Sequence, residues 1–175
     1  EIYGSDVMRL GVIQNNYSNE GFDEVKASGL EFIEICCNFD NEVEKIISSK
    51  EQIKAETART GVEVSCVGRW NHNLNENGSI NPKKAELYYD LLDTAIYLGA
   101  KTFVCGINYD KEISLYKNYQ NAISFFGELI KRADGKIKIA IQNCNWNNFV
   151  VSPREGEVVL GELPELMIKY DASHA

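Results

Sequence analysis

The sequence predicts an α/β protein built on a parallel sheet, and three observations support this class. Short apolar runs rich in β-branched residues recur along the chain, and helical patterns lie between most of them. Glycines that suit a helix end precede the second to the fifth run, at Gly29, Gly61, Gly99 and Gly135. Subtracting these residue numbers gives separations of 32, 38 and 36, the length of a repeated βα unit.

The apolar runs are short and continuous, as in strands that are buried on both faces of a sheet. We expect strands within residues 8–14, 32–37, 62–68, 102–107, 137–143 and 167–171. Six parallel strands fit either an open doubly wound sheet or a barrel that stops after its sixth strand. The first strand runs into Gln14 and Asn15 rather than a glycine-rich turn, which weakens the case for a nucleotide-binding open sheet.

The clearest helix is predicted over residues 81–98. Asn81 suits the N-cap, Pro82 suits the first helical position, and Gly99 can end the helix in a left-handed conformation. Similar apolar repeats predict helices over residues 42–60 and 116–133.

The region 145–165 breaks this rhythm. It contains prolines and glycines and shows no helical period, so we expect a loop or hairpin with residues 157–160 extended. Long loops in such folds usually frame a site.

Length and composition exclude several classes of protein. A chain of 175 residues with 44% hydrophobic and 25% charged residues is expected to form one ordinary globular domain. We expect no membrane partner, because the chain has no apolar run of about 18 residues and its first residues do not resemble a secretory signal. The net charge of −8 argues against a nucleic-acid partner.

The five cysteines are Cys36, Cys37, Cys66, Cys105 and Cys144. They lie in or beside the apolar runs without the short paired spacings of zinc sites, so we expect buried, reduced thiols. Such thiols fit a protein of the reducing cytoplasm.

The predicted strand ends are rich in amides and also carry two tryptophans. These residues are Gln14, Asn15, Asn16, Asn38, Trp70, Asn71, Asn73, Asn108, Gln142, Asn143, Asn145, Trp146, Asn147 and Asn148. Amides bind neutral hydroxyl groups and an indole face stacks on a sugar ring, so the set as a whole predicts a polyhydroxylated ligand. Any single asparagine is more simply explained as a turn or capping residue.

A few charged or titratable residues stand at the same strand ends. Asp171 and His174 are spaced like metal ligands or sugar contacts, although this pair is a weak motif alone. His72 lies in a loop, where substrate contact and a structural role both fit. For Glu34 in the second strand we favour a structural role.

Four segments in order resemble a known family. They are Gly-Leu-Glu-Phe-Ile-Glu-Ile at 29–35, Leu-Gly-Ala-Lys-Thr-Phe-Val at 98–104, Ile-Ala-Ile-Gln-Asn at 139–143 and Tyr-Asp-Ala-Ser-His at 170–174. This succession resembles the sugar phosphate isomerases and epimerases of the xylose isomerase-like TIM barrel family. The resemblance implies a (β/α)8 barrel of which residues 1–175 are a single domain, truncated on its C-terminal side after about six of eight βα units.

The resemblance also implies a site for one divalent cation, such as Mn, Mg, Co or Zn, held by residues of the last four strands of the barrel. It assigns Asp171 to the sixth-strand ligand position and His174 to a neighbouring substrate contact. The fifth-strand position, a glutamate in the family, is Gln142 here, which can lend a neutral oxygen but cannot take a proton. The remaining ligands and the base would lie beyond Ala175, so we expect this chain alone to bind metal weakly and to be inactive.

The resulting hypothesis is a sugar or sugar-phosphate isomerase/epimerase that transfers a proton next to a carbonyl with the help of a metal. Asp171 and Gln142 are the expected metal ligands. The expected substrate-binding residues are His174, His72, Trp70, Asn108, Asn143, Asn145 and Trp146.

Three alternatives stay open. A catalytically degenerate member would bind carbohydrate without turnover, as the amide at Gln142 suggests. An abasic-site endonuclease also carries Asp-x-x-His on its sixth strand, but it needs further histidine and glutamate ligands and a basic surface. An incomplete barrel would also expose two strand edges that invite pairing with another chain, including a second copy.

Overall fold

The computed structural model describes residues 8–70, 73–144 and 147–174, and its main feature is a six-stranded parallel sheet. The strands are β1 (Gly11–Ile13), β2 (Phe32–Cys36), β3 (Glu63–Gly68), β6 (Thr102–Cys105), β7 (Lys138–Gln142) and β8 (Met167–Lys169). They pair in the order β1-β2-β3-β6-β7-β8. All six predicted strands are confirmed, each within the expected residues.

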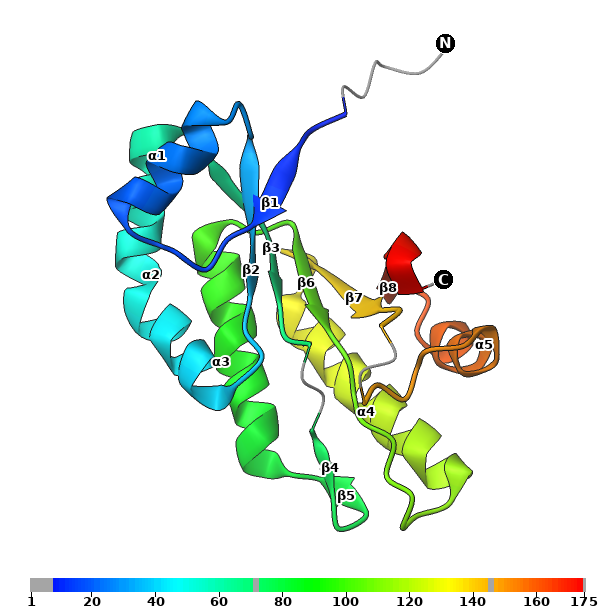
Figure 1. Cartoon of the computed structure of the whole chain (residues 1–175). Coiled ribbons are helices and arrows are strands. Elements are labelled where there is room, and N and C mark those ends of the chain that lie inside the picture. The colour runs from blue at the N-terminus through cyan, green and yellow to red at the C-terminus, as the bar shows by residue number, and fades with distance from the viewer. Residues whose placement is uncertain (1–7, 71–72, 145–146, 175) are drawn as a thin grey trace.

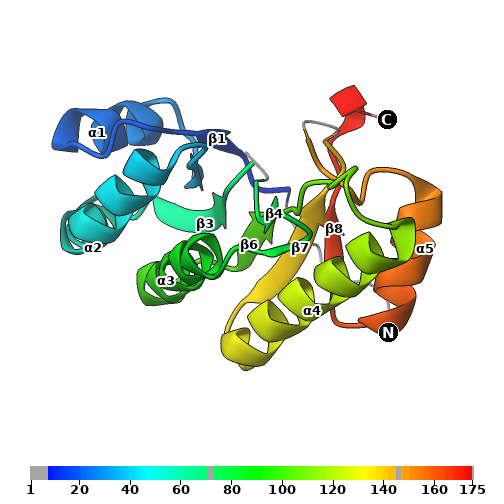
Figure 2. The same ribbon diagram turned by 90° about the horizontal axis from the view of Figure 1, so that it is seen from below.

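Five helices follow strands along the chain and cover one face of the sheet. They are α1 (Asn19–Ala27), α2 (Asp40–Thr60), α3 (Pro82–Leu98), α4 (Leu115–Ala133) and α5 (Pro153–Glu162). Figure 1 shows the strands running side by side, and Figure 2 shows the helices arranged in an arc around the curved sheet. The alternation of strands and helices is that of a barrel which is incomplete in this chain.

The main hydrophobic core lies between the sheet and the helices. Ile33, Phe103 and Ile139 from the strands belong to the same buried cluster as Tyr88 and Phe125 from the helices. A second, small cluster lies on the concave face and consists of Cys66, Val104 and Ala140. Because side chains alternate along a strand, residues in register with these three also point into the interior of the barrel.

The predicted ends of α3 are confirmed. Asn81 Oδ1 accepts hydrogen bonds from the main-chain N–H groups of Lys83 at 3.0 Å and Lys84 at 3.3 Å. Pro82 is the first helical residue, and Gly99 ends the helix with φ of 84°. The other two predicted helices are also present, as α2 and α4.

The prediction of a loop or hairpin over residues 145–165 is wrong, because α5 occupies much of it. The main-chain N–H of Ser152 donates to Glu155 Oε2 at 3.1 Å, and Pro153 takes the first helical position. These are helix-start signals that override the two glycines, Gly156 and Gly161, inside the helix.

A short antiparallel hairpin follows β3 and was not predicted. It is formed by β4 (Asn75–Glu76) and β5 (Ser79–Ile80). Asn77 and Gly78 connect the two strands with φ of 52° and 81°, the left-handed pair that a two-residue Asn-Gly turn requires. The hairpin lies at the same end of the sheet as the loops after the other strands (Figure 1).

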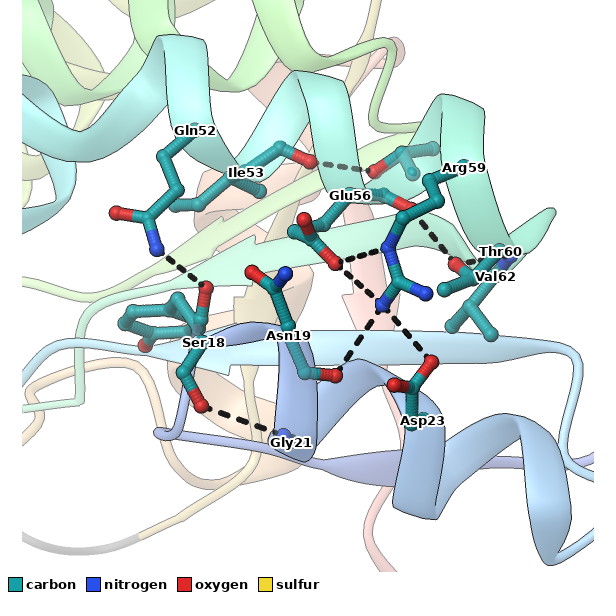
Figure 3. Close-up of polar contacts among 12 residues, drawn as sticks. Ser18, Asn19, Gly21, Asp23, Gln52, Ile53, Glu56, Arg59, Thr60 and Val62 are labelled. Atoms are coloured by element: carbon teal, nitrogen blue, oxygen red, sulfur yellow. Dashed lines mark hydrogen bonds and ion pairs between the residues drawn. The ribbon is translucent and has the colours of Figure 1, made fainter.

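The helix α1 and the segment before it are attached to α2 by polar contacts (Figure 3). Arg59 Nη2 lies 2.6 Å from the Glu56 carboxylate and 2.8 Å from the Asp23 carboxylate, and donates to the Asn19 carbonyl at 3.2 Å. Gln52 Nε2 donates to the Tyr17 carbonyl at 3.3 Å. These contacts fix α1 relative to α2.

All five cysteines are free and buried, which confirms the predicted reduced thiols. Among the residues that the structure describes, no helix is both long enough and apolar enough to cross a bilayer.

Candidate functional site

The carboxyl ends of the parallel strands meet at one end of the sheet, and three predicted site residues lie there. Trp70 follows β3, Gln142 is the last residue of β7, and Asp171 follows β8. Gln142 pairs in register with Lys169, so Asp171 lies two residues beyond this pair. The expectation that the strands are parallel, and that their ends share one end of the sheet, is confirmed.

Gln142 is a buried polar residue, with 1% of its surface exposed. It alternates with Ala140 along β7 and therefore faces the barrel interior. Its main-chain carbonyl accepts a hydrogen bond from Asn148 Nδ2 at 2.9 Å, but its side-chain Oε1 has no partner among the described residues. A buried acceptor left unpaired costs about 1–3 kcal/mol, so a ligand hydroxyl that binds this oxygen gains free energy.

Trp70 presents a second unpaired polar atom. Its Nε1 is buried without a hydrogen-bond partner in the described part of the chain, as is Asn73 Oδ1. The indole folds back over the end of β3, since Nε1 lies 3.0 Å from the position that a Cβ on Gly68 would occupy. The Lys169 ammonium lies 5.0 Å from the centre of the indole ring. Trp70 therefore lies over the barrel interior near Lys169, the register partner of Gln142.

Asn143 and Asp171 brace the ends of β7 and β8 against each other. Asn143 Nδ2 donates to the Asp171 carbonyl at 2.9 Å, and the Asp171 N–H donates to Asn143 Oδ1 at 2.8 Å. The Asp171 carboxylate accepts hydrogen bonds from the Ser173 N–H at 2.9 Å and the Ser173 hydroxyl at 2.7 Å. Asn143, predicted to bind substrate, thus has a positioning role for Asp171 in this structure.

Asn108, also predicted to bind substrate, belongs to a buried network of asparagines. Asn108 Oδ1 accepts from the Asn75 N–H at 2.7 Å, and Asn108 Nδ2 donates to the Asn75 carbonyl at 3.0 Å. Asn121 Nδ2 donates to Asn75 Oδ1 at 2.9 Å. The network ties the hairpin after β3 to the loop after β6, and both side-chain groups of Asn108 are used in it.

The structure does not test several of the other predicted substrate contacts. His72, Asn145 and Trp146 lie outside the described residues. The main chain of His174 closes the short 3-10 helix η1 (Ala172–His174), which starts directly after Asp171.

The buried thiols near the site are poor nucleophiles. Burial and the neighbouring charges of Cys37 and Glu34 raise the pKa of Cys36 to about 12. Burial, followed by the charge of Glu34, also raises the pKa of Cys66. Both thiols stay protonated at neutral pH, so neither Cys36 nor Cys66 is suited to covalent catalysis.

Comparison with known proteins identifies the fold family. A sequence model of the xylose isomerase-like TIM barrel family matches residues 22–175, which is most of the chain. The chain belongs to this family. No curated protein matches the sequence.

Solved structures with the same xylose isomerase-like fold include sugar epimerases. The 3-keto-D-glucoside 4-epimerase from E. coli has a TM-score of 0.70 at 13% identity, over 92% of this chain and 67% of its own. A D-allulose 3-epimerase from Methylomonas sp. has a TM-score of 0.68 at 19% identity, over 95% and 64%. The IolI protein with a bound zinc atom has a TM-score of 0.72 at 14% identity, also over 95% and 64%. The chain spans about two thirds of the length of these proteins.

The described residues do not form a complete metal site. No group of three or more histidine, cysteine, aspartate and glutamate residues among them is arranged to hold an ion. Gln142 Oε1, which lacks a partner, and the Asp171 carboxylate are the two oxygen donors at neighbouring strand ends. Oxygen donors of this kind suit a hard divalent cation, and further ligands are needed to complete its shell.

Sequence reasoning missed Lys169 at this site. Lys169 alternates with Met167 and Asp171, so its side chain also points into the barrel, where it forms an ion pair with Glu34. This pair agrees with the structural role favoured for Glu34. The signal that could have revealed it is the spacing of two residues between Lys169 and Asp171, because side chains two apart on a strand share a face.

Proposed function

We propose that the protein is a sugar or sugar-phosphate isomerase/epimerase that moves a proton next to a carbonyl group. Membership of the xylose isomerase-like family supports this class, and sugar epimerases are among the structures that share its fold. The observation that carries the proposal is the pair of unpaired buried atoms at the strand ends, Gln142 Oε1 and Trp70 Nε1. An acceptor and a donor together suit a hydroxyl group, which can pair with both.

Each residue then has a defined task. The Trp70 indole provides an apolar surface for the C–H face of the sugar, and its N–H donates to a hydroxyl oxygen. Gln142 accepts a hydrogen bond from a hydroxyl, and the hydrogen bonds of Asn143 fix Asp171 at the end of the neighbouring strand. Gln142 cannot take the proton that the reaction removes, because its amide is not a base in the accessible pH range. A separate residue must therefore act as the base.

A divalent cation is part of the proposal. Gln142 Oε1 and Asp171 would hold it, together with ligands outside this pair, and when bound it would polarise the substrate carbonyl. We further propose that residues 1–175 are part of a single barrel domain, and that the enzyme works in carbohydrate metabolism in the cytoplasm. The free, buried cysteines support this compartment.

The test is proton exchange by the full-length protein. A panel of ketoses and ketose phosphates is incubated in deuterated buffer with Mn²⁺, Mg²⁺, Co²⁺, Zn²⁺ or a chelator, and the loss of carbon-bound hydrogen is followed by NMR. We expect metal-dependent exchange with at least one sugar, and at least a tenfold loss of rate in Asp171→Asn, which corresponds to about 1.4 kcal/mol. Absence of exchange with every sugar and every ion would contradict the proposal.

The amide at Gln142 favours a second candidate, a member of the family that binds carbohydrate without turnover. The two candidates are separated by Gln142→Glu, with Gln120→Glu on the exposed surface of α4 as the matched control. If the first candidate is right, the parent already exchanges, and Gln142→Glu changes the exchange rate whereas Gln120→Glu does not. Tight sugar binding by the parent, with no turnover in either variant, would establish the binding protein instead.

A further inference from the structure

An ion pair inside the barrel lies beside the proposed site, and the proposed function assigns it no role. Lys169 Nζ and the Glu34 carboxylate are in contact, and their side chains are 26% and 14% exposed. Lys169 belongs to β8 and Glu34 to β2, which are separated in the sheet by β3, β6 and β7. The pair therefore crosses the concave face, over a cavity of about 380 Å³ that both residues line.

The same ammonium group holds the indole of Trp70. Its distance of 5.0 Å from the ring centre is within the range of cation–π attraction, which strengthens as the cation loses water. Glu34 fixes the ammonium from one side, and the indole covers it on another. Among the described residues, Lys169 is the one cation that lies over the Trp70 ring.

The indole can take this position because residue 68 is a glycine and has no side chain. A Cβ at residue 68 would lie 3.0 Å from Trp70 Nε1 and 3.4 Å from the Val104 carbonyl oxygen, both tight contacts. The absence of a side chain lets the indole fold over the end of β3 instead of turning outward. Two local features thus determine the position of the indole ring: the space above Gly68 and the ammonium group of Lys169.

We infer that the ion pair of Glu34 and Lys169 holds the Trp70 indole in position, so that the indole forms one wall of the proposed sugar-binding site. The ammonium fixes the plane of the indole, whose N–H lies buried against Gly68. Glu34 keeps the ammonium in place and neutralises it, which leaves no net charge under a neutral sugar ring. The role of Trp70 as a sugar contact rests on the proposed function, whereas its attachment to Lys169 does not.

The first test measures the circular dichroism and the fluorescence quenching of Trp70 without a contribution from other tryptophans. Trp146→Phe in the full-length protein leaves Trp70 as the one remaining tryptophan of residues 1–175, and any tryptophan beyond them is replaced in the same way. In this background we compare Lys169→Met with Lys169→Arg and with Lys136→Met, an exposed lysine paired with Asp134. Lys169→Met should change the near-ultraviolet circular dichroism of Trp70 and raise its quenching by acrylamide about twofold, because the cation–π contact is lost. Lys169→Arg and Lys136→Met should leave both signals close to those of the parent.

A second variant separates positioning from stability. Lys169→Met alone leaves the Glu34 carboxylate buried without its partner, which destabilises the fold. Glu34→Gln with Lys169→Met removes both charges, so the midpoint of urea unfolding should return towards the parent value while the Trp70 signals stay changed. If the double variant also restores the Trp70 signals, or if Lys169→Met leaves them unchanged, the positioning role is overturned.

Sugar binding completes the test. With a neutral sugar that the parent binds, the double variant should weaken the Kd about tenfold, equivalent to about 1.4 kcal/mol. Loss of affinity for a sugar phosphate without loss for the neutral sugar would overturn the inference, since Lys169 would then be a direct phosphate contact. If the Trp70 signals change as expected but the parent binds no sugar, the proposed function fails and the attachment of Trp70 stands.

Discussion

At the scale of single residues, the amides at the strand ends have two different roles, structural and proposed ligand-binding. The sequence alone does not show which amide has which role. Asn16, Asn108, Asn143 and Asn148 use their side chains for main-chain hydrogen bonds that close loops or join strand ends. Gln142 retains an oxygen without a partner in the described structure. An amide has the same donors and acceptors in both roles, so only its surroundings reveal which role it has.

The buried network gives a prediction for Asn108. Asn108→Ala would leave the main-chain N–H and carbonyl of Asn75 unpaired in the interior, and we expect it to lower the free energy of unfolding by about 2–4 kcal/mol. The measurement is urea unfolding followed by circular dichroism. The control is Asn41→Ala on the exposed side of α2, expected to stay within about 0.5 kcal/mol of the parent. Equal stabilities for the two variants would contradict the structural role of Asn108.

The thiol of Cys36 gives a prediction about pH. Its pKa is raised from 9.0 to about 12 in the folded state, first by burial. The folded protein therefore favours the protonated thiol, and this contribution to stability is fully present below the unfolded pKa of 9.0 and is lost as pH rises to about 12. We expect the urea midpoint to fall above pH 9, and to fall less steeply in Cys36→Ala than in the parent. Identical slopes in both proteins would show that Cys36 is not the group that titrates.

At the scale of elements, helices and strands were predicted where local signals agreed with the pattern of burial. The Asn81 cap, Pro82 and Gly99 define α3 in the sequence and in the structure. The helix α5 was not predicted because its two internal glycines argue against a helix, although Ser152 and Glu155 form a capping pair at its start. The β4–β5 hairpin was missed because its strands are only two residues long, although its Asn-Gly turn was visible.

The glycines of α5 give a prediction for that element. A Cβ at Gly161 would meet nothing within 4 Å, and one at Gly156 would meet only Leu160 Cδ1, at 3.9 Å. Gly156→Ala and Gly161→Ala should each raise the free energy of unfolding by about 0.5–1 kcal/mol, because alanine is the better helix former.

The matched control is the same substitution where the backbone demands glycine. Gly99 ends α3 with φ of 84°, a conformation that costs a residue with a side chain about 1–2 kcal/mol. Gly99→Ala should therefore lower the thermal midpoint while the two α5 variants raise it. A fall in all three variants would mean that α5 is not a stable helix in solution.

At the scale of the whole molecule, the parallel order of the strands does most to define the site. The repeat of βα units and the resemblance to the family predicted this order, and it brings Trp70, Gln142 and Asp171 to one end of the sheet. The Glu34 and Lys169 pair could not be predicted in the same way. Its members lie 135 residues apart and meet only because the sheet curves, so the contact depends on the tilt and curvature of all six strands.

The curved sheet has two open edges, at β1 and β8, and this leads to a prediction about association. Ile13 on β1 and Ile168 on β8 are 47% and 54% exposed, and both edges present unpaired main-chain groups. Exposed apolar strand edges favour pairing with other chains. We therefore expect a polypeptide of residues 1–175 to associate as its concentration rises, measured by sedimentation velocity over about a hundredfold range of concentration, enough to shift a two-state equilibrium.

Charge at the edges should suppress this association. Ile13→Lys with Ile168→Lys introduces side chains that natural edge strands use against pairing, and we expect a larger monomer fraction at every concentration. Val158→Lys on α5 is the control, because Val158 is 39% exposed but lies on a helix and not on a strand edge. If the control suppresses association as strongly as the edge variants, general surface charge explains the effect. Association unchanged by the edge lysines would show that the chains meet through another surface.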